Sequence, residues 1–311
     1  MFGNIILLTI LYAIPMMMVA LGGVFAERSG VINLGLEGGM IFGAFIGAIV
    51  CKAVIEGSKV DGGGYALASN QGVFILGMFV SMLAGAIFSL LLSFSAINLK
   101  ADQTIGGTAL NLLAPAIVLT FGLLIPTIRS DKVDSHASFS LGGENYLSTY
   151  ICLALFIGLS IWLYKSKIGM HLRACGEHPS AADSVGINVY KMRYLGTTIS
   201  GALAGLGGFV YIFTRVSGIA ESSVAGLGFL SLAIMIFGNW NPVLIALGAL
   251  LFGFLKVLGV VANSTFLEAL NLPGYFYNML PYIIVIVTLV LSRNNSGVPK
   301  AEGIPYDKGA R

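Results

Sequence analysis

The chain has 311 residues, of which 57% are hydrophobic and only 10% are charged, and its mean hydropathy is +0.90. A water-soluble domain of this length needs more polar residues than this to cover its surface. The composition therefore excludes a soluble globular protein and predicts a polytopic membrane protein. The net charge of +3 does not indicate nucleic-acid binding. The Lys and Arg residues flank hydrophobic stretches, which is the pattern of membrane topology signals.

Nine apolar stretches follow one another and predict an all-α membrane fold with about nine transmembrane helices, within a range of about eight to ten. In lipid each stretch must satisfy its own backbone hydrogen bonds, which favours helices. The first stretch lacks a basic leader and a small-residue cleavage site, so it is interpreted as a retained helix rather than a signal peptide. The stretches are Gly3–Phe25, Val31–Ile55, Gly72–Leu99, Thr104–Ile125, Ser148–Tyr164, Tyr194–Thr214, Ala225–Gly238, Pro242–Val261 and Tyr275–Leu291.

Cations gather in one internal loop and in the C-terminal tail. The loop contains Lys165, Lys167, Arg173, Lys191 and Arg193, and the tail contains Arg293, Lys300, Lys308 and Arg311. The positive-inside rule places both segments in the cytosol, and an odd number of helices then places the N-terminus outside. The loops 56–71 and 126–147 are expected on the outer side.

The expected topology contains an internal symmetry. The first four helices start outside and the last four start inside, as in transporters with inverted repeats. A glycine-rich break accompanies the second helix of each set, at SGVINLGLEGG and at VAGLGFLSLAIMIFGNWNP. We therefore divide a single permease domain, 1–311, into a first repeat (1–125), a connecting helix with a cytosolic loop (148–193), a second repeat (194–292) and a tail (293–311). The alternative is that the glycines only allow close helix packing.

No enzymatic or energising motif is found. The sequence lacks GxxxxGK[ST], HExxH, GxSxG and paired His/Cys ligands, so we expect no catalytic residue, no metal site and no cofactor bound by this chain. The driving force is expected to come from another polypeptide. An ion-coupled carrier or channel is the alternative, but mid-helix ionisable residues are few. Glu37 adjoins the first break, and Lys256 lies where it can reach the membrane surface.

The basic loop is predicted to contain a short helix. Pro179 suits a first helical position, and Gly186 suits the residue beyond the last turn. Ala181, Ala182 and Val185 would form an apolar patch, with Ser180, Asp183 and Ser184 facing water. Two turns are marginal alone, so this helix needs a partner such as an energising subunit. A helix lying on anionic lipid is the alternative, which the lack of Lys or Arg between Pro179 and Val189 disfavours.

Five segments resemble the permease subunits of bacterial ABC importers for simple sugars, nucleosides and branched-chain amino acids. The resemblance is strongest to the shorter nucleoside-type permease. Sugar permeases of this family usually have another N-terminal helix and a GGIDLSVG-like segment, which this chain lacks, so the resemblance favours a nucleoside over ribose. The segments are ERSGVINLGLEGG (Glu27–Gly39), KADQTIGGTALNLL (Lys100–Leu113), RACGEHPSAADSVGINVYKMR (Arg173–Arg193), LAIMIFGNWNP (Leu232–Pro242) and GIPYDKGAR (Gly303–Arg311).

The resemblance implies a membrane subunit of an importer in the bacterial plasma (inner) membrane. Its partners would be cytosolic ABC ATPases that bind ATP and Mg²⁺, a second and different permease, and an external binding protein or lipoprotein. Riboflavin, a purine or a simple sugar are the alternative cargoes. The resemblance also implies a helix that couples the permease to the ATPase, with the residues Arg173, Gly176, Glu177, Pro179, Ala181, Ala182, Val185 and Gly186.

Polar residues near the helix breaks are the candidates for the substrate path. Neutral hydrogen-bonding groups suit a nucleoside better than charges do. Hydrogen bonds between helices are the alternative role for each of them. Glu27 and Arg28 are interpreted as a local pair or cap at a helix end, with an inner gate as the alternative. The path candidates are Asn33, Glu37, Gln103, Thr108 and Asn111.

Overall fold

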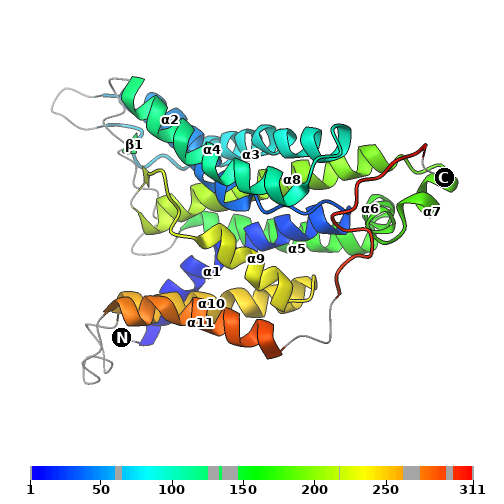
Figure 1. Ribbon diagram of the computed structural model, residues 1–311. Helices are drawn as coiled ribbons and strands as arrows, with labels where there is room; N and C mark the ends of the chain where they lie inside the picture. Colours follow the sequence, from blue (N-terminus) through cyan, green and yellow to red (C-terminus); the bar gives the residue numbers. More distant parts are fainter. Residues whose placement is uncertain are drawn as a thin grey trace.

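The computed structural model describes residues 2–59, 65–124, 133–134, 146–216, 218–261, 274–291 and 297–309. Within these residues the chain is a bundle of helices (Figure 1). Most of the predicted outer loop 126–147 and part of the loop 56–71 lie outside the described residues. The helices are α1 (Phe2–Arg28), α2 (Leu36–Glu56), α3 (Gln71–Ser93) with a π-helical extension η1 (Phe94–Asn98), α4 (Gln103–Leu124), α5 (Leu147–Lys165), α6 (Lys167–Glu177), α7 (Pro179–Ser184), α8 (Val189–Arg215), α9 (Leu227–Phe237), α10 (Pro242–Val261) and α11 (Gly274–Leu291).

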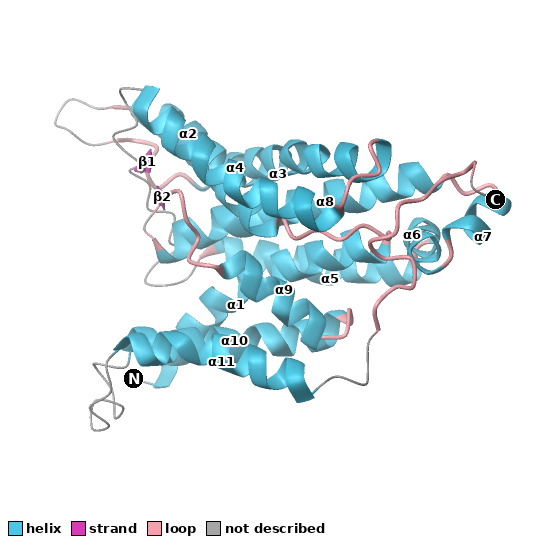
Figure 2. Cartoon of the chain, viewed as in Figure 1, coloured by secondary structure: helices cyan, strands magenta, loops and turns pink. Residues whose placement is uncertain are grey.

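The bundle has two distinct ends. Helices α6 and α7 and the C-terminal tail lie at one, which we call the α7 end (Figure 1). Two short strands, β1 (Val133–Asp134) and β2 (Ile219–Ala220), lie at the other and pair antiparallel, with Val133 opposite Ala220 (Figure 2). The start of α1 and the C-terminus therefore lie at opposite ends of the bundle (Figure 1).

Each predicted apolar stretch coincides with a helix. Among the described residues, seven helices are long and apolar enough to cross a membrane, namely α1, α2, α3 with η1, α4, α5, α8 and α10. Helix α9 has only 11 residues. The chain is thus a helical, multi-pass membrane protein, while the count of nine crossings and the inverted repeat stay predictions.

Helix α8 is central because its glycines admit neighbouring backbones. A Cβ atom on Gly205 would overlap the carbonyl oxygen of Ser81 in α3, and one on Gly208 would overlap that of Met40 in α2. Close backbone approach between small residues is a main source of helix association in lipid. In α8, these glycines therefore serve to let the neighbouring helices pack closely. Next to them, the rings of Phe209 and Phe74 pack with centroids 5.5 Å apart.

The polar stretch 165–193 is more helical than we predict from sequence. The helix expected at Pro179 is confirmed as α7, with Gly186 just beyond it at φ +86°. Helix α6 was not predicted, although Ser166 caps it by accepting a hydrogen bond from the Gly169 amide at 3.0 Å. Helix α8 also starts at Val189, so Lys191 and Arg193 belong to a helix and not to a loop.

Candidate functional site

The first helix break is a buried, non-helical connection between α1 and α2. Helix α2 begins at Leu36, five residues after the predicted start of its stretch, because side chains replace the missing backbone hydrogen bonds here. The Gln103 Oε1 atom accepts a hydrogen bond from the Ile32 amide at 2.7 Å. The Asn33 Oδ1 atom accepts one from the Gly35 amide at 3.0 Å, and Asn33 Nδ2 donates to the Ser200 hydroxyl at 2.8 Å.

Helix α4, which begins at Gln103, contacts the same break a second time. The Asn111 Nδ2 atom donates to the carbonyl oxygen of Leu34 at 2.8 Å, and its Oδ1 atom accepts from the Gly38 amide at 2.8 Å. Thr108 is not part of this arrangement. Its side chain is exposed, and its hydroxyl group donates to carbonyl oxygens of its own helix. The structure thus brings Asn33, Gln103 and Asn111 together at the first break.

Glu37 connects the first break with the second one, which precedes α9. Its carboxylate is buried and accepts hydrogen bonds from the amides of Gly226, at 3.0 Å, and Gly228, at 2.6 Å. Glu37 lies in the first turn of α2 and at the start of α9, where both helix dipoles favour a negative charge. One carboxylate therefore caps α9 from α2 and fixes the two breaks to each other.

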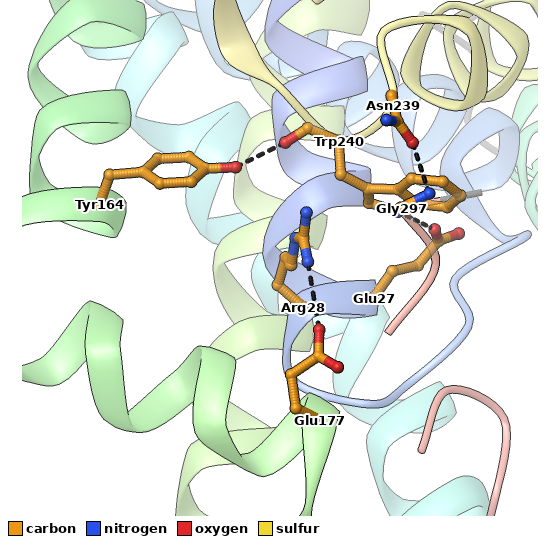
Figure 3. A network of polar contacts seen from close by, with 7 residues as sticks. All are labelled: Glu27, Arg28, Tyr164, Glu177, Asn239, Trp240 and Gly297. Carbon is orange, nitrogen blue, oxygen red and sulfur yellow. Dashed lines mark hydrogen bonds and ion pairs between the residues drawn. The ribbon is translucent and has the colours of Figure 1, made fainter. Parts of the chain in front are cut away.

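At the α7 end, α1 reaches two distant elements through adjacent charged residues (Figure 3). The Trp240 indole N–H donates to the Glu27 carboxylate at 2.6 Å, and Arg28 Nη1 pairs with Glu177 of α6 at 3.4 Å. The Tyr164 hydroxyl of α5 donates to the Trp240 carbonyl oxygen at 2.6 Å. The interpretation of Glu27 and Arg28 as a local pair is wrong, because each joins α1 to a remote element.

Trp240 lies in a strained turn between α9 and α10. Its φ is +56° and that of Asn239 is +50°, a region that bulky residues rarely adopt. The contacts with Glu27 and Tyr164 hold the tryptophan in this conformation. Strain held by surrounding contacts is a feature of switch regions. The Asn239 Oδ1 atom in turn accepts a hydrogen bond from the tail amide of Gly297 (Figure 3).

Three of the predicted coupling residues attach α6 to the bundle. The Arg173 guanidinium lies over the Tyr164 ring at 5.0 Å and donates to the Tyr164 carbonyl oxygen at 3.3 Å. Gly176 lies against the end of α1, where a Cβ atom would overlap the Arg28 carbonyl oxygen. Glu177 pairs with Arg28. These residues thus fix α6 to the ends of α1 and α5.

The α7 residues divide between an inner and an outer face. Ala182 is buried against Cys175 and Val189, while Ala181, Val185 and Gly186 are exposed and Pro179 is half-buried. The expected common patch of Ala181, Ala182 and Val185 is therefore wrong, because Ala182 points inward. Asp183, expected to face water, pairs with Lys308 of the tail at 3.1 Å.

The tail segment 297–309 folds back over the α7 end, which sequence reasoning missed. Arg193, predicted as a loop cation, is buried at 1% exposure, and its Nη1 atom donates to the Ile304 carbonyl oxygen at 2.9 Å. Burial raises the pKa of the Glu302 carboxyl group to about 7, although Arg28 opposes the shift. Lys100 pairs with Asp307 at 2.5 Å, which raises the pKa of the lysine and lowers that of the aspartate.

The described polar contacts of this arrangement hold backbone segments in place. Cys51, Cys152 and Cys175 are free thiols and all are buried. In the part of the chain that the structure describes, no three His, Cys, Asp or Glu side chains are placed to hold a metal ion. Contacts in the described part of the α7 end instead link α1, α5, α6, α7, the α9–α10 turn and the tail.

Comparison with known proteins gives a consistent result. A guanosine ABC transporter permease of Bacillus subtilis, NupQ, is 38% identical over 97% of this chain and 96% of its own length. A nucleoside ABC transporter permease of Lactococcus lactis, NupC, is 34% identical over 96% of this chain and 95% of its own length. A putative glucose ABC transporter permease of Haloferax volcanii, TsgC13, is 29% identical over 82% of this chain and 77% of its own length. No solved structure matches the chain.

The profile of the family described as branched-chain amino acid transport system / permease component matches residues 5–289, which is nearly all of the helical bundle. The chain therefore belongs to this family of ABC transporter permeases.

Proposed function

We propose that this chain is a membrane-spanning subunit of an ATP-driven importer that takes up a nucleoside. The observation that carries the proposal is the similarity to NupQ and NupC, at 38% and 34% identity over at least 95% of both chains. The chain supplies the path, and the ATP and Mg²⁺ are bound by partner ATPases. An external binding protein delivers the cargo, and a second, different permease completes the path.

The α7 end faces the cytosol, and the start of α1 faces outward. The positive-inside rule supports this orientation, because the α7 end contains the basic residues of α6 and of the tail. The positions of the chain ends at opposite ends of the bundle agree with it (Figure 1). Nine crossings in the plasma membrane of a bacterium, arranged as the repeats 1–125 and 194–292, complete the proposed topology. The break before α2 and the break before α9, joined through Glu37, support the repeat.

Helix α7 docks into the ATPase. Ala181 and the Val185 side chain, which is 75% exposed, present its outer face to the partner. When the ATPases close on ATP, α7 moves, and α6 passes the displacement to α1 through Gly176 and Glu177. Trp240 and Glu27 then connect α1 with the turn after α9. Transport is a shift between two packings of these contacts, which requires that the ATPase bind one packing better.

The polar residues of the breaks border the path. Asn33, Glu37, Gln103 and Asn111 hold the breaks in shape, so they act on cargo passage through the backbone conformation. Thr108 is exposed on α4 and faces the second permease across the path. Recognition of the cargo is left to the binding protein, which agrees with the hydrogen bonds that already occupy most described polar groups of the first break, the Gln103 Nε2 atom excepted.

Uptake by the reconstituted complex tests the proposal. The chain is purified with the ATPase, second permease and binding protein of the same organism and placed in vesicles. We expect radiolabelled guanosine to accumulate with ATP, unchanged by ionophores that collapse ion gradients. Accumulation without ATP that disappears with the ion gradient would establish the alternative, an ion-coupled carrier. Competition by riboflavin, purines or simple sugars that exceeds competition by nucleosides would reassign the cargo.

A further inference from the structure

The tail segment 297–308 contacts the first helix break, the turn after α9 and the α6–α7 segment. The Ala301 amide donates to the Gly176 carbonyl oxygen of α6 at 2.9 Å. Lys308 pairs with Asp183 of α7 at 3.1 Å, and Asp307 pairs with Lys100, before α4, at 2.5 Å. The tail therefore holds α6 and α7 at two separate points and also reaches the start of α4.

The other contacts of the tail are with the first break and with the turn after α9. Gly303, at φ +74°, lies so close to Ile32 of the first break that a Cβ atom would be 2.8 Å from the Ile32 Cδ1 atom. The Gly297 amide donates to Asn239 in the strained turn after α9 at 2.5 Å. The buried Arg193, which donates to the Ile304 carbonyl oxygen, also lies beside Gly30 at the end of α1.

The tail is packed into the bundle rather than laid on its surface. Pro299, Ala301 and Tyr306 are buried, and the Tyr306 ring packs on that of Tyr190, with centroids 5.5 Å apart. Fixing about twelve residues costs backbone entropy of roughly 1–2 kcal/mol each, so the contacts must offset a considerable cost. A segment held so firmly moves together with the elements that it contacts.

We propose that residues 297–308 are a positioning strap that makes α6 and α7 move together with the first helix break and with the turn after α9. The inference rests on the proposed ATP-driven function. Besides the tail, described contacts link α6 to the first break through α1, and to the turn after α9 through α1 or Tyr164 and then Trp240. The strap contacts the moving helices, the first break and the turn after α9 directly. It therefore passes the displacement of α7 to the path and sets how much transport each ATP supports.

The decisive variant weakens the strap at its contact with the first break. Gly303→Val places a branched side chain at a positive φ and against Ile32, so it disfavours the seated tail. Gly309→Ala is the matched control, because Gly309 is exposed, is not at a positive φ, and a Cβ atom there would meet only Asp307 at 3.5 Å. The complex of each variant with its ATPase, second permease and binding protein is reconstituted, and guanosine uptake and ATP hydrolysis are measured together.

We expect Gly303→Val to retain bound ATPase and ATP hydrolysis while guanosine uptake per ATP falls by at least about fivefold, the lower range of typical coupling effects. Gly309→Ala should leave this ratio unchanged. A second pair tests the α7 contact independently. Lys308→Asp and Asp183→Lys should each lower the ratio, and the double exchange should restore it, which simple loss of stability would not do.

Three outcomes would overturn the inference. The first is an unchanged ratio in Gly303→Val. The second is a parallel loss of ATPase binding and uptake, which would make the tail part of the docking surface only. The third is an absence of rescue in the double exchange. Failure of the proposed function is distinguishable, because the unsubstituted complex itself would then show no ATP-dependent uptake, and the strap inference would fall with it.

Discussion

Glu302 is a tail carboxyl group whose surroundings disfavour its charge. It is half-buried with its Oε2 atom covered and without a hydrogen-bond partner in the described residues, and it lies close enough to Glu27 and Arg28 to interact with both charges. Removal of water from a carboxylate favours the protonated form, so the pKa of Glu302 rises from 4.5 to about 7. Between these two pKa values, the Glu302 carboxyl group therefore keeps a proton in the folded protein that it releases in the unfolded chain.

The stability of the protein should depend on pH through this group. Because its pKa is raised on folding, its contribution is present below pH 4.5 and is lost as pH rises to about 7. We expect the thermal midpoint in detergent to fall across that range. Glu302→Gln should remove this part of the dependence and leave the profile flatter. An identical profile for the glutamine variant would show that Glu302 does not titrate there.

Gly176 is the predicted coupling residue whose requirement the structure explains most directly. Its Cβ position is taken by the Arg28 carbonyl oxygen, so Gly176→Ala must push α6 away from α1. Overpacking of this kind costs about 1–3 kcal/mol, and we expect a lower thermal midpoint and a weaker Arg28–Glu177 contact. Gly158→Ala in α5 is the control, since nothing lies within 4 Å of its Cβ position. Equal effects of the two substitutions would contradict this account.

Helix α9 depends on a cap that another helix provides. The N-cap residue Gly226, just before α9, has no side chain, and the Glu37 carboxylate of α2 accepts hydrogen bonds from the Gly226 and Gly228 amides instead. A helix of 11 residues is too short to be stable without such tertiary support. The second break is therefore only as well ordered as its contact with the first.

Substitution of Glu37 should loosen α9 selectively. Loss of a helix cap costs about 0.5–2 kcal/mol, so Glu37→Ala should increase amide hydrogen exchange in the first turn of α9. Glu37→Gln retains one acceptor oxygen and should have a smaller effect. Exchange in α5, which lies apart from this contact, serves as the reference. Protection of α9 that stays the same in Glu37→Ala would mean that the cap is dispensable.

At the scale of elements, hydropathy was sufficient to locate the long apolar helices in the sequence, but it did not locate the short polar ones. Pro179 and Gly186 located α7 because both act locally on the backbone. Helix α6 escaped prediction because its charged and glycine residues resemble a loop, although Ser166 was an available capping signal. The position of the tail was not predictable, since the contact between Arg193 and Ile304 joins residues far apart in the sequence and leaves no periodic pattern.

For the candidate site as well, the sequence predicted which residues matter but not which groups they contact. Asn33, Gln103 and Asn111 were selected as hydrogen-bonding residues near the breaks, and the structure does bring them to the first break. Most of their partners turned out to be backbone groups, which sequence alone does not specify, and Asn33 also donates to the distant Ser200 hydroxyl. Glu27 and Trp240 were missed as a pair for the same reason, because neither residue type predicts a partner more than 200 positions away.

At the scale of the whole molecule, the two ends of the bundle should face opposite sides of the membrane. All three native cysteines are buried, so a membrane-impermeant maleimide has no exposed native target in the folded protein. We expect Lys308→Cys, at the α7 end, to react only in inside-out vesicles. Lys59→Cys, after α2, should react only in right-side-out vesicles. Labelling of both positions from one side would contradict the proposed orientation.

The tail has a further consequence for the biogenesis of the protein. Residues 297–308 leave the ribosome after all the helices that the structure describes, so Gly176 and Arg193 lack their tail contacts while those helices insert into the membrane. A chain that stops within α11 therefore leaves the Arg193 side chain and the Gly176 carbonyl oxygen without their contacts to the tail. Among the described segments, the tail is the last that can take its place.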